Sequence, residues 1–264
     1  MGTLTTKDLT IRFGGHVAVN AVSCTFEPGT LTAIVGPNGA GKTTYFNLIS
    51  GQLAASSGTV TLNGRDLSGM SASGRTRAGL GRAFQLTNLF PHLSVLENVR
   101  LAVQATREGA HRRGLNLWSI WSDHPALTAR AEEVLESVAL IDKSDSDVAS
   151  LPHGDQRKLE VAMLMALESQ VLMFDEPTAG MSADEMPAVL NLIRKLKQDK
   201  SKTILLVEHK MDVVRELADR IVVLHNGTLV ADGEPAEVIA SPIVQEAYLG
   251  VAREDGKIES MAAA

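Results

Sequence analysis

A glycine-rich stretch, GPNGAGKT at 36–43, joins two segments of different periodicity. The run before it, LTAIV at 31–35, is short and almost wholly apolar, which is typical of a strand buried on both faces of a parallel sheet. The segment after it, KTTYFNLIS at 42–50, has a helical pattern and meets Gly51, a residue type that commonly ends helices. This order of strand, glycine turn and helix predicts an α/β fold.

The glycine-rich stretch fits the pattern G-x-x-x-x-G-K-[ST] of a phosphate-binding loop. Small residues let successive backbone N–H groups surround phosphate oxygens, and the helix behind them adds the positive end of its dipole. We expect Lys42 to reach the β- and γ-phosphates and the Thr43 hydroxyl to ligate Mg²⁺. The predicted contacts to the nucleotide are Gly36, Pro37, Asn38, Gly39, Ala40, Gly41, Lys42 and Thr43.

Further apolar runs follow the pattern of buried strands separated by helices. VLMF at 171–174 and TILLV at 203–207 extend the predicted parallel sheet. The segment 220–233 carries an Asn-Gly pair between two apolar halves, which is typical of a β-hairpin. Near the beginning of the chain, the β-rich segments 3–13, 17–27 and 58–64 are separated by turn residues. The alternation in TLTTKDLTIRF predicts that the first of them is an edge strand.

Between 88 and 168 the strand runs give way to helical patterns such as LTARAEEVLESVAL. We therefore expect a helical insertion in the α/β core. The polar end of the chain is expected to be disordered. The predicted organisation is one domain over 1–250, with the core and the β subdomain in 1–87 and 169–250, the helical part in 88–168 and the tail in 251–264.

Two carboxylates, Asp175 and Glu176, follow the apolar run VLMF. Alone, such a pair is more often a solvated strand end. Beside a phosphate-binding loop, it predicts that Asp175 holds Mg²⁺ and that Glu176 orients and deprotonates the attacking water. His209 follows TILLV in the same way and is expected to contact the γ-phosphate, although an isolated histidine there is usually structural. Gln85, between the core and the insertion, is a candidate to connect metal or water with movement of the insertion.

The composition is that of an ordinary globular protein, with 44% apolar and 21% charged residues. The net charge of −6 argues against a general nucleic-acid-binding surface. The single cysteine, Cys24, excludes an internal disulfide, and we expect it to pack as a small apolar side chain. The longest apolar stretch, 161–167, is far shorter than the ~20 residues of a membrane span. Any association with a membrane is therefore expected to be peripheral.

In this order, the motifs resemble the ATPase subunit of an ABC transporter, and the resemblance covers about 3–250. It implies a P-loop (RecA-like) α/β fold with a parallel-sheet core, an N-terminal antiparallel β subdomain and a helical insertion. It also implies ATP and Mg²⁺ as ligands, a second ATPase subunit and transmembrane permease subunits as partners, and a location at the cytoplasmic face of the cell membrane. A periplasmic or extracellular solute-binding protein would take part indirectly, and no nucleic acid is expected.

The resemblance also implies functions for particular residues. Phe13 stands where the family stacks an aromatic ring on adenine. The phosphate loop spans 36–44, which adds Thr44 to the predicted contacts. Gln85 matches the Q-loop glutamine, which implies both a catalytic function and a contact to the metal, and His209 matches the switch histidine.

The segment LPHGDQ at 151–156 matches the family's signature, which faces the phosphate loop of the partner subunit. Two departures act at the same interface, because Pro152 replaces the usual serine and Ser182 replaces the aspartate of the D-loop. Proline has neither a hydroxyl nor an N–H, so contact with ATP is expected through the backbone and the helix dipole, with His153 as an alternative donor. The predicted nucleotide contacts in this segment are Gly154 and Asp155.

Several stretches narrow the resemblance to the uptake ATPases for branched-chain amino acids and their relatives for urea and other small amides or acids. They are FQLTNLFPHLSVLENV, GDQRKLEVA, DEPTAGMS and AYLG. Two alternatives stay open, namely a soluble ABC-type ATPase and a nucleotide-dependent regulator with little turnover. Trp118 and Trp121 lie in an arginine-rich stretch and are expected either to dock on membrane subunits or to pack under the insertion.

Overall fold

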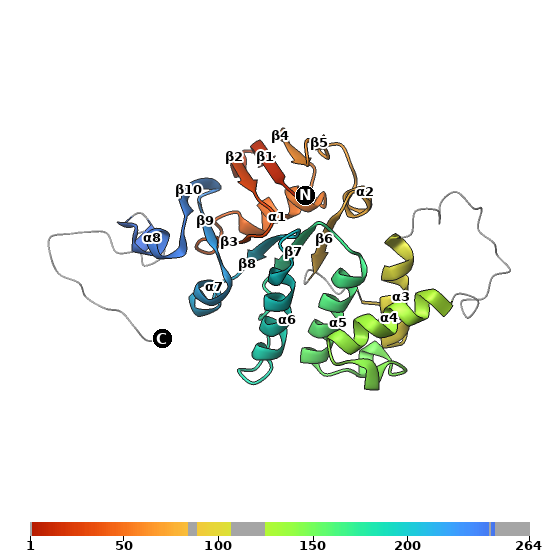
Figure 1. The fold of residues 1–264 in the computed structure, drawn as a ribbon. Helices are drawn as coiled ribbons and strands as arrows, with labels where there is room; N and C mark the ends of the chain where they lie inside the picture. Colours follow the sequence, from red (N-terminus) through yellow and green to blue (C-terminus); the bar gives the residue numbers. More distant parts are fainter. Residues whose placement is uncertain (1, 84–88, 107–124, 243, 246–264) are drawn as a thin grey trace.

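The computed structural model describes residues 2–83, 89–106, 125–242, 244 and 245 (Figure 1). Its strands form an antiparallel sheet in the order β2-β1-β4-β5 and a six-stranded, mostly parallel sheet in the order β10-β9-β3-β8-β7-β6. The antiparallel sheet contains β1 (Leu4–Phe13), β2 (His16–Phe26), β4 (Ser57–Leu62) and β5 (Arg65–Asp66). The six-stranded sheet contains β3 (Leu31–Val35), β6 (Leu80–Ala83), β7 (Val171–Asp175), β8 (Thr203–Val207), β9 (Arg220–His225) and β10 (Thr228–Gly233).

The helices lie on both sides of the six-stranded sheet. Helix α1 packs between the two sheets, whereas α5 and α6 cover the opposite face (Figure 1). The helices are α1 (Lys42–Ser50), α2 (Ala72–Arg77), α3 (Val95–Thr106), α4 (Pro125–Ser137), α5 (His153–Ala166), α6 (Met186–Gln198), α7 (Met211–Leu217) and α8 (Pro235–Ala240), with 3-10 turns η2 (Ile141–Lys143) and η3 (Val148–Ser150).

Alternation along the central strands divides the core into two layers. In β7, Val171 and Met173 join the layer that contains α1 and the antiparallel sheet, whereas Leu172 and Phe174 join the layer beneath the helices. This follows from the two-residue period of a strand, which sends successive side chains to opposite faces. A strand with both faces covered must be apolar throughout its buried length, as the sequence predicts for this run.

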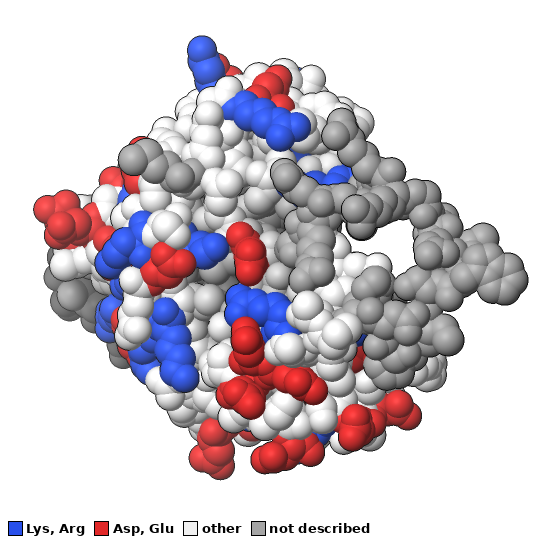
Figure 2. All heavy atoms as spheres, turned by 45° about the vertical axis from the view of Figure 1, so that its right-hand side comes forward, with Lys and Arg blue, Asp and Glu red and all other residues white. Residues whose placement is uncertain are grey.

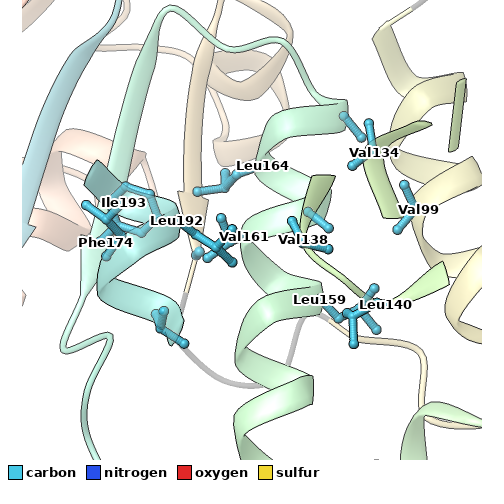
Figure 3. Packing of buried hydrophobic residues seen from close by; sticks show 14 of the residues in the cluster. Val99, Val134, Val138, Leu140, Leu159, Val161, Leu164, Phe174, Leu192 and Ile193 are labelled. Carbon is cyan, nitrogen blue, oxygen red and sulfur yellow. The ribbon is translucent and has the colours of Figure 1, made fainter. Parts of the chain in front are cut away.

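The lower layer joins the sheet to the helices of the predicted insertion. Helix α5 is central to it, since Val161 and Leu164 face the side of Phe174 while Leu159 faces α4 and the turn after it (Figure 3). Val99 of α3 closes the far side of this layer (Figure 3). The helices from 95–166 therefore share one continuous apolar core with the six-stranded sheet.

The local predictions around the glycines are confirmed. Helix α1 ends at Gly51, which has φ 79° in the left-handed region. The hairpin of β9 and β10 turns through Asn226 and Gly227, whose φ angles are 48° and 74°. Two consecutive positive φ angles are the requirement of a tight hairpin turn, and asparagine and glycine tolerate them best.

The single cysteine, Cys24, lies in β2 and is buried, as expected. Burial raises the pKa of its thiol to about 11.

One prediction about the strands is wrong, and one strand is not predicted at all. Strand β1 is central in its sheet, with β2 and β4 as antiparallel neighbours, and is not an edge strand. Alternation of apolar and polar residues indicates which face of a strand is covered, but it does not indicate how many strands pair with its backbone. The sequence analysis also misses β6, which pairs in parallel with β7 at the edge of the six-stranded sheet. Its four residues, Leu80–Ala83, are few and include an arginine, so they show no apolar run.

The surface carries charges of both signs. Figure 2 shows Lys and Arg side chains next to Asp and Glu side chains across the face that contains the helical part. Among the described residues, no helix combines the length and the apolar composition that crossing a membrane requires.

Candidate functional site

The phosphate-binding loop lies where β3 meets α1, at the carboxyl end of a central parallel strand. Its glycines are sterically required. A Cβ at Gly36 would lie 2.1 Å from the carbonyl oxygen of Leu224, and a Cβ at Gly41, which has φ 95°, would lie 2.5 Å from that of Ala18. The loop is thus packed against β9 and β2, and only residues without a side chain fit at these two positions.

Lys42 is the first residue of α1, and its side chain folds back over the loop. Its ammonium group donates to the carbonyl oxygens of Gly36 at 2.7 Å and Pro37 at 2.9 Å. The residue is 6% exposed, and burial lowers the pKa of Lys42 while the nearby carboxylates of Glu176 and Asp175 oppose that shift. A cation held inside the loop and close to two carboxylates is arranged to bind anionic oxygens that arrive between them.

Asp175 is the last residue of β7, and an arginine from the neighbouring strand holds it. Arg82 of β6 donates to its carboxylate at 2.6 Å and also to the side-chain oxygens of Asn47 and Ser50, each at 2.7 Å. The guanidinium carbon lies 5.2 Å from the centre of the Phe46 ring. Burial raises the pKa of Asp175, and the ion pair with Arg82 acts against this rise.

Glu176 and His209 form a hydrogen-bonded pair at the end of the sheet. The Nε2 atom of His209 lies 2.6 Å from Oε1 of Glu176, and both side chains are partly exposed. Glu176 has φ 53°, in the left-handed region that non-glycine residues rarely adopt. Strained backbone of this kind is concentrated at functional sites, where the surrounding structure holds it in place.

Behind this pair lies a buried carboxylate, Glu208, which is 3% exposed. It accepts hydrogen bonds from the backbone N–H groups of His209 at 2.6 Å and Lys210 at 3.1 Å. The hydroxyl of Thr178, which is 1% exposed, also donates to it. The carboxylate therefore joins the segment after β7 to the segment after β8.

The predicted signature segment begins α5, with Pro152 at the N-cap and no side-chain cap. A carboxylate lies beside this end of the helix, because a Cβ at Gly154 would be only 3.0 Å from Oε1 of Glu185. Glu185 accepts hydrogen bonds from the backbone N–H of Ser182 at 3.1 Å and from its hydroxyl at 3.0 Å. These hydrogen bonds lower the pKa of Glu185. Ser182 thus binds an acidic residue of its own chain in the turn before α6.

Asp155 lies in the first turn of α5 and binds two lysines. Lys143 pairs with one carboxylate oxygen, and Lys158 donates to the other at 2.8 Å. Burial opposes the shift, but these ammonium groups lower the pKa of Asp155. Both carboxylate oxygens are thus directed to neighbours within the helical part, and contact of this residue with a nucleotide stays a prediction.

The remaining predicted residues differ in what the structure says of them. Phe13 is 50% exposed at the end of β1, and its stacking on adenine stays a prediction. Thr43 is exposed in the first turn of α1, and Thr44 is half-buried. Gln85, Trp118 and Trp121 lie outside the described residues.

The site fits a nucleoside triphosphate and a magnesium ion. Space is open beside Gly39, where a Cβ would meet no atom within 4 Å, and Lys42 supplies a buried cation in the same loop. Hydroxyl and carboxylate oxygens such as those of Thr43 and Asp175 are the donors that Mg²⁺ prefers. The arrangement can bind phosphates at one end of the sheet and present Glu176 to a water molecule next to them.

Comparison with known protein families shows where the chain belongs. Residues 19–179 match the family described as "ABC transporter". The chain belongs to the ABC transporter family. It is therefore an ATPase subunit with the nucleotide-binding cassette of that family, and the predicted fold class is confirmed. Residues 228–254 match a second model, described as "Branched-chain amino acid ATP-binding cassette transporter".

Relatives of this ABC transporter ATPase extend over nearly its whole length. The chain is 38% identical over 250 residues to the high-affinity branched-chain amino acid transport ATP-binding protein LivG of Salmonella typhimurium, which covers 94% of this chain and 98% of that protein. It is 36% identical over 251 residues to BraF of Pseudomonas aeruginosa, which carries the same description, with 94% and 98% covered. Similarity of this extent confirms the narrower resemblance to this branch of the family.

Solved structures give the same result for the fold. A crystal structure of an ATP-binding cassette of an ABC transporter in its ADP conformation has a TM-score of 0.80 and 28% identity, and covers 95% of this chain and 100% of that one. A nucleotide-free ATP-binding cassette has a TM-score of 0.79 and 26% identity, with 94% and 99% covered.

Sequence reasoning misses four residues that the structure brings into the site of this ABC transporter ATPase. The side chains of Arg82, Thr178 and Glu208 reach the predicted catalytic carboxylates or their loops, and that of Glu185 reaches the signature segment. A charged residue directly after an apolar strand run was the available signal for Glu208, which follows TILLV. The short strand of Arg82 offers no comparable signal.

Proposed function

We propose that this chain is the ATP-hydrolysing subunit of an importer for branched-chain amino acids or related small solutes. The similarity to LivG and BraF over almost the full length supports the solute class. The observation that carries the proposal is the Glu176–His209 pair beside a loop with a buried lysine, because this arrangement can both bind phosphates and activate water.

Nucleotide binding begins at the loop. Phe13 stacks on the adenine ring, which fits its half-exposed position. Residues 36–44 surround the phosphates through backbone N–H groups and the end of α1. Lys42 exchanges its loop carbonyls for β- and γ-phosphate oxygens, since an ammonium group binds an anion more strongly than a neutral carbonyl.

Mg²⁺ would be held by Thr43 and Asp175, with Gln85 as a further contact, and would supply positive charge to the phosphate oxygens. The chain prepares Asp175 for this function through Arg82, which fixes its carboxylate at the end of β7. A carboxylate that is already oriented loses little conformational freedom when a ligand arrives.

Hydrolysis depends on Glu176. Its carboxylate accepts the proton of the attacking water, while the Nε2–H of His209 donates to the same side chain and keeps it in place. We also expect His209 to contact the γ-phosphate after the nucleotide has bound.

The complete transporter needs further subunits. A second ATPase subunit would place its signature segment over this chain's loop, and Gly154 with Asp155 would act on the partner's nucleotide. We favour a partner of different sequence, because Pro152 lacks the serine hydroxyl. Transmembrane permease subunits would hold the ATPase at the cytoplasmic face of the membrane, with Trp118 and Trp121 at the docking surface. The solute-binding protein acts only through the permease.

The test is Glu176→Gln, which keeps the size of the side chain and removes the base. We expect ATP affinity within about threefold of wild type and a turnover rate lower by about 10²–10⁴-fold, the usual contribution of general-base catalysis. Steady-state phosphate release and equilibrium binding of ATP measure the two quantities. Turnover close to that of wild type would show that another group activates the water.

A further inference from the structure

Glu208 has no part in the chemistry described above, yet its environment is specific. It directly follows β8, is 3% exposed, and accepts three hydrogen bonds from neutral donors. Acidic residues are almost never fully buried unless their oxygens are satisfied in this way. A carboxylate that serves only stability could be replaced by an apolar side chain at such a position. Its donors therefore indicate what it does.

All three donors belong to the two segments that carry the proposed catalytic pair. Two are the backbone N–H groups of His209 and Lys210, at 2.6 Å and 3.1 Å from Oε2. The third is the hydroxyl of Thr178, which donates to Oε1 and lies two residues after Glu176. One oxygen of Glu208 thus binds the histidine segment, and the other binds the segment of the general base.

Both segments need such support. Glu176 has φ 53°, and a strained backbone of this kind persists only where its surroundings over-determine it. On one side its own N–H donates to the carbonyl oxygen of Val207 at 2.9 Å. On the other side Thr178 is fixed by Glu208. The side chains of Glu176 and His209 are 2.6 Å apart. Glu208 binds the segments that carry both residues.

We infer that Glu208 is a positioning residue for hydrolysis, which through Thr178 and the backbone of His209 holds the Glu176–His209 pair in its reactive arrangement. The inference rests on the proposed function. It adds that turnover depends on a buried contact between two segments, whereas ATP affinity depends on the loop of Lys42, which Glu208 does not touch.

The test compares Glu208→Met with Glu208→Gln in the full-length chain. Methionine has a similar size but accepts no strong hydrogen bond, whereas glutamine keeps an acceptor for the two N–H groups and can donate to the Thr178 hydroxyl. We expect Glu208→Met to lower kcat by about 10- to 100-fold, the cost of misplacing a reacting group by about 1 Å, with KM for ATP changed by less than about threefold. Glu208→Gln should lose less than about fivefold.

A second pair of variants avoids the loss of a buried carboxylate. Thr178→Val removes the hydroxyl at nearly constant shape and should lower kcat by about 3- to 10-fold at unchanged KM, because one hydrogen bond to a charged group is lost. Thr178→Ser should restore most of kcat. Thr203→Val is the matched control. Thr203 is also buried, and its hydroxyl donates to the carbonyl oxygen of Gly2 at 2.7 Å, but it lies at the end of β8 that is far from Glu208.

The outcomes separate this inference from the proposed function. An inactive wild-type chain that also fails to bind ATP would contradict the proposed function itself. An active wild type with kcat of Glu208→Met and Thr178→Val within twofold of its own would overturn only the positioning by Glu208. Equal losses in Thr203→Val and Thr178→Val, or parallel changes of kcat and KM, would also overturn it, because they would indicate a general effect on the fold.

Discussion

The phosphate loop and the signature segment are both loops that lead into the N-terminus of a helix, but they are completed differently. The loop before α1 contains a cation of its own, Lys42, which is bound to loop carbonyls. The end of α5 has an anion beside it, the carboxylate of Glu185, which lies next to Gly154. The first region is therefore prepared to receive phosphate. In the second, a phosphate that approaches Gly154 must replace a carboxylate that is already there.

The comparison teaches that a helix N-terminus does not by itself make an anion site ready for use. The N-termini of α1 and α5 carry the same positive partial charge. The two N-termini differ in the side chains that lie near them. Lys42 lies beside α1, where it can bind a ligand, whereas Glu185 lies beside α5 and pairs with residues of its own chain.

Lys42→Ala should remove the cation of the first region and lower ATP affinity by about 100-fold or more. Two charge-assisted hydrogen bonds to phosphate would be lost, at about 1.5–3 kcal/mol each. Equilibrium binding of ATP measures the effect, and Lys195→Ala, at an exposed position of α6, is the control. An affinity within twofold of wild type would contradict the assignment of 36–44 as the phosphate loop.

The same small substitution in the two regions should have unequal effects on stability. A Cβ at Gly41 meets a backbone carbonyl at 2.5 Å and requires φ 95°, whereas a Cβ at Gly154 meets Oε1 of Glu185 at 3.0 Å, the end of a flexible side chain. Gly41→Ala should lower the free energy of unfolding by about 1–3 kcal/mol, the usual cost of such strain. Gly154→Ala should lower it by no more than about 0.5 kcal/mol.

Thermal unfolding of both variants checks this prediction, with wild type measured under the same conditions. Equal shifts in the melting temperature would mean that Glu185 cannot move aside. In that case the signature segment would be as rigid as the phosphate loop, and the contrast between them would fail.

Pro152→Ser should raise the ATPase rate of the isolated chain severalfold. The hydroxyl would restore a donor at the N-cap of α5, where proline offers none. A missing charge-assisted hydrogen bond of about 1.5–3 kcal/mol corresponds to a rate lower by about 10- to 100-fold, of which the backbone and the dipole recover a part.

Pro152→Ala is the matched control, because it removes the ring and supplies an N–H without a hydroxyl. Steady-state phosphate release at saturating ATP measures all three proteins. If serine and proline give the same rate, the backbone of Gly154 and the helix dipole are sufficient and the absent hydroxyl has no consequence.

The features that the sequence predicts well are local ones. The order of strand, glycine loop and helix over 31–50, the end of α1 at Gly51 and the turn at Asn226 each depend on residue types within a few positions, and the structure confirms all three. The predicted pair Asp175–Glu176 also lies at the end of its strand as expected.

The features that the sequence could not predict depend on contacts between distant segments. Arg82 reaches Asp175 across 93 positions, and Thr178 reaches Glu208 across 30. Nothing in the local pattern of either residue reveals its partner. The edge position predicted for β1 failed for the same reason, because the number of neighbouring strands is decided by segments elsewhere in the chain.

Because the backbone at Glu176 is left-handed, selection for stability and selection for activity favour different residues at this position. Glycine would adopt that conformation without the cost of about 1–2 kcal/mol that a residue with a Cβ incurs there. Selection for folding alone would therefore drift toward glycine at this position, whereas the proposed function of Glu176 as general base requires that glutamate is kept. The thermodynamic margin that the rest of the chain supplies is what lets evolution retain the less stable choice.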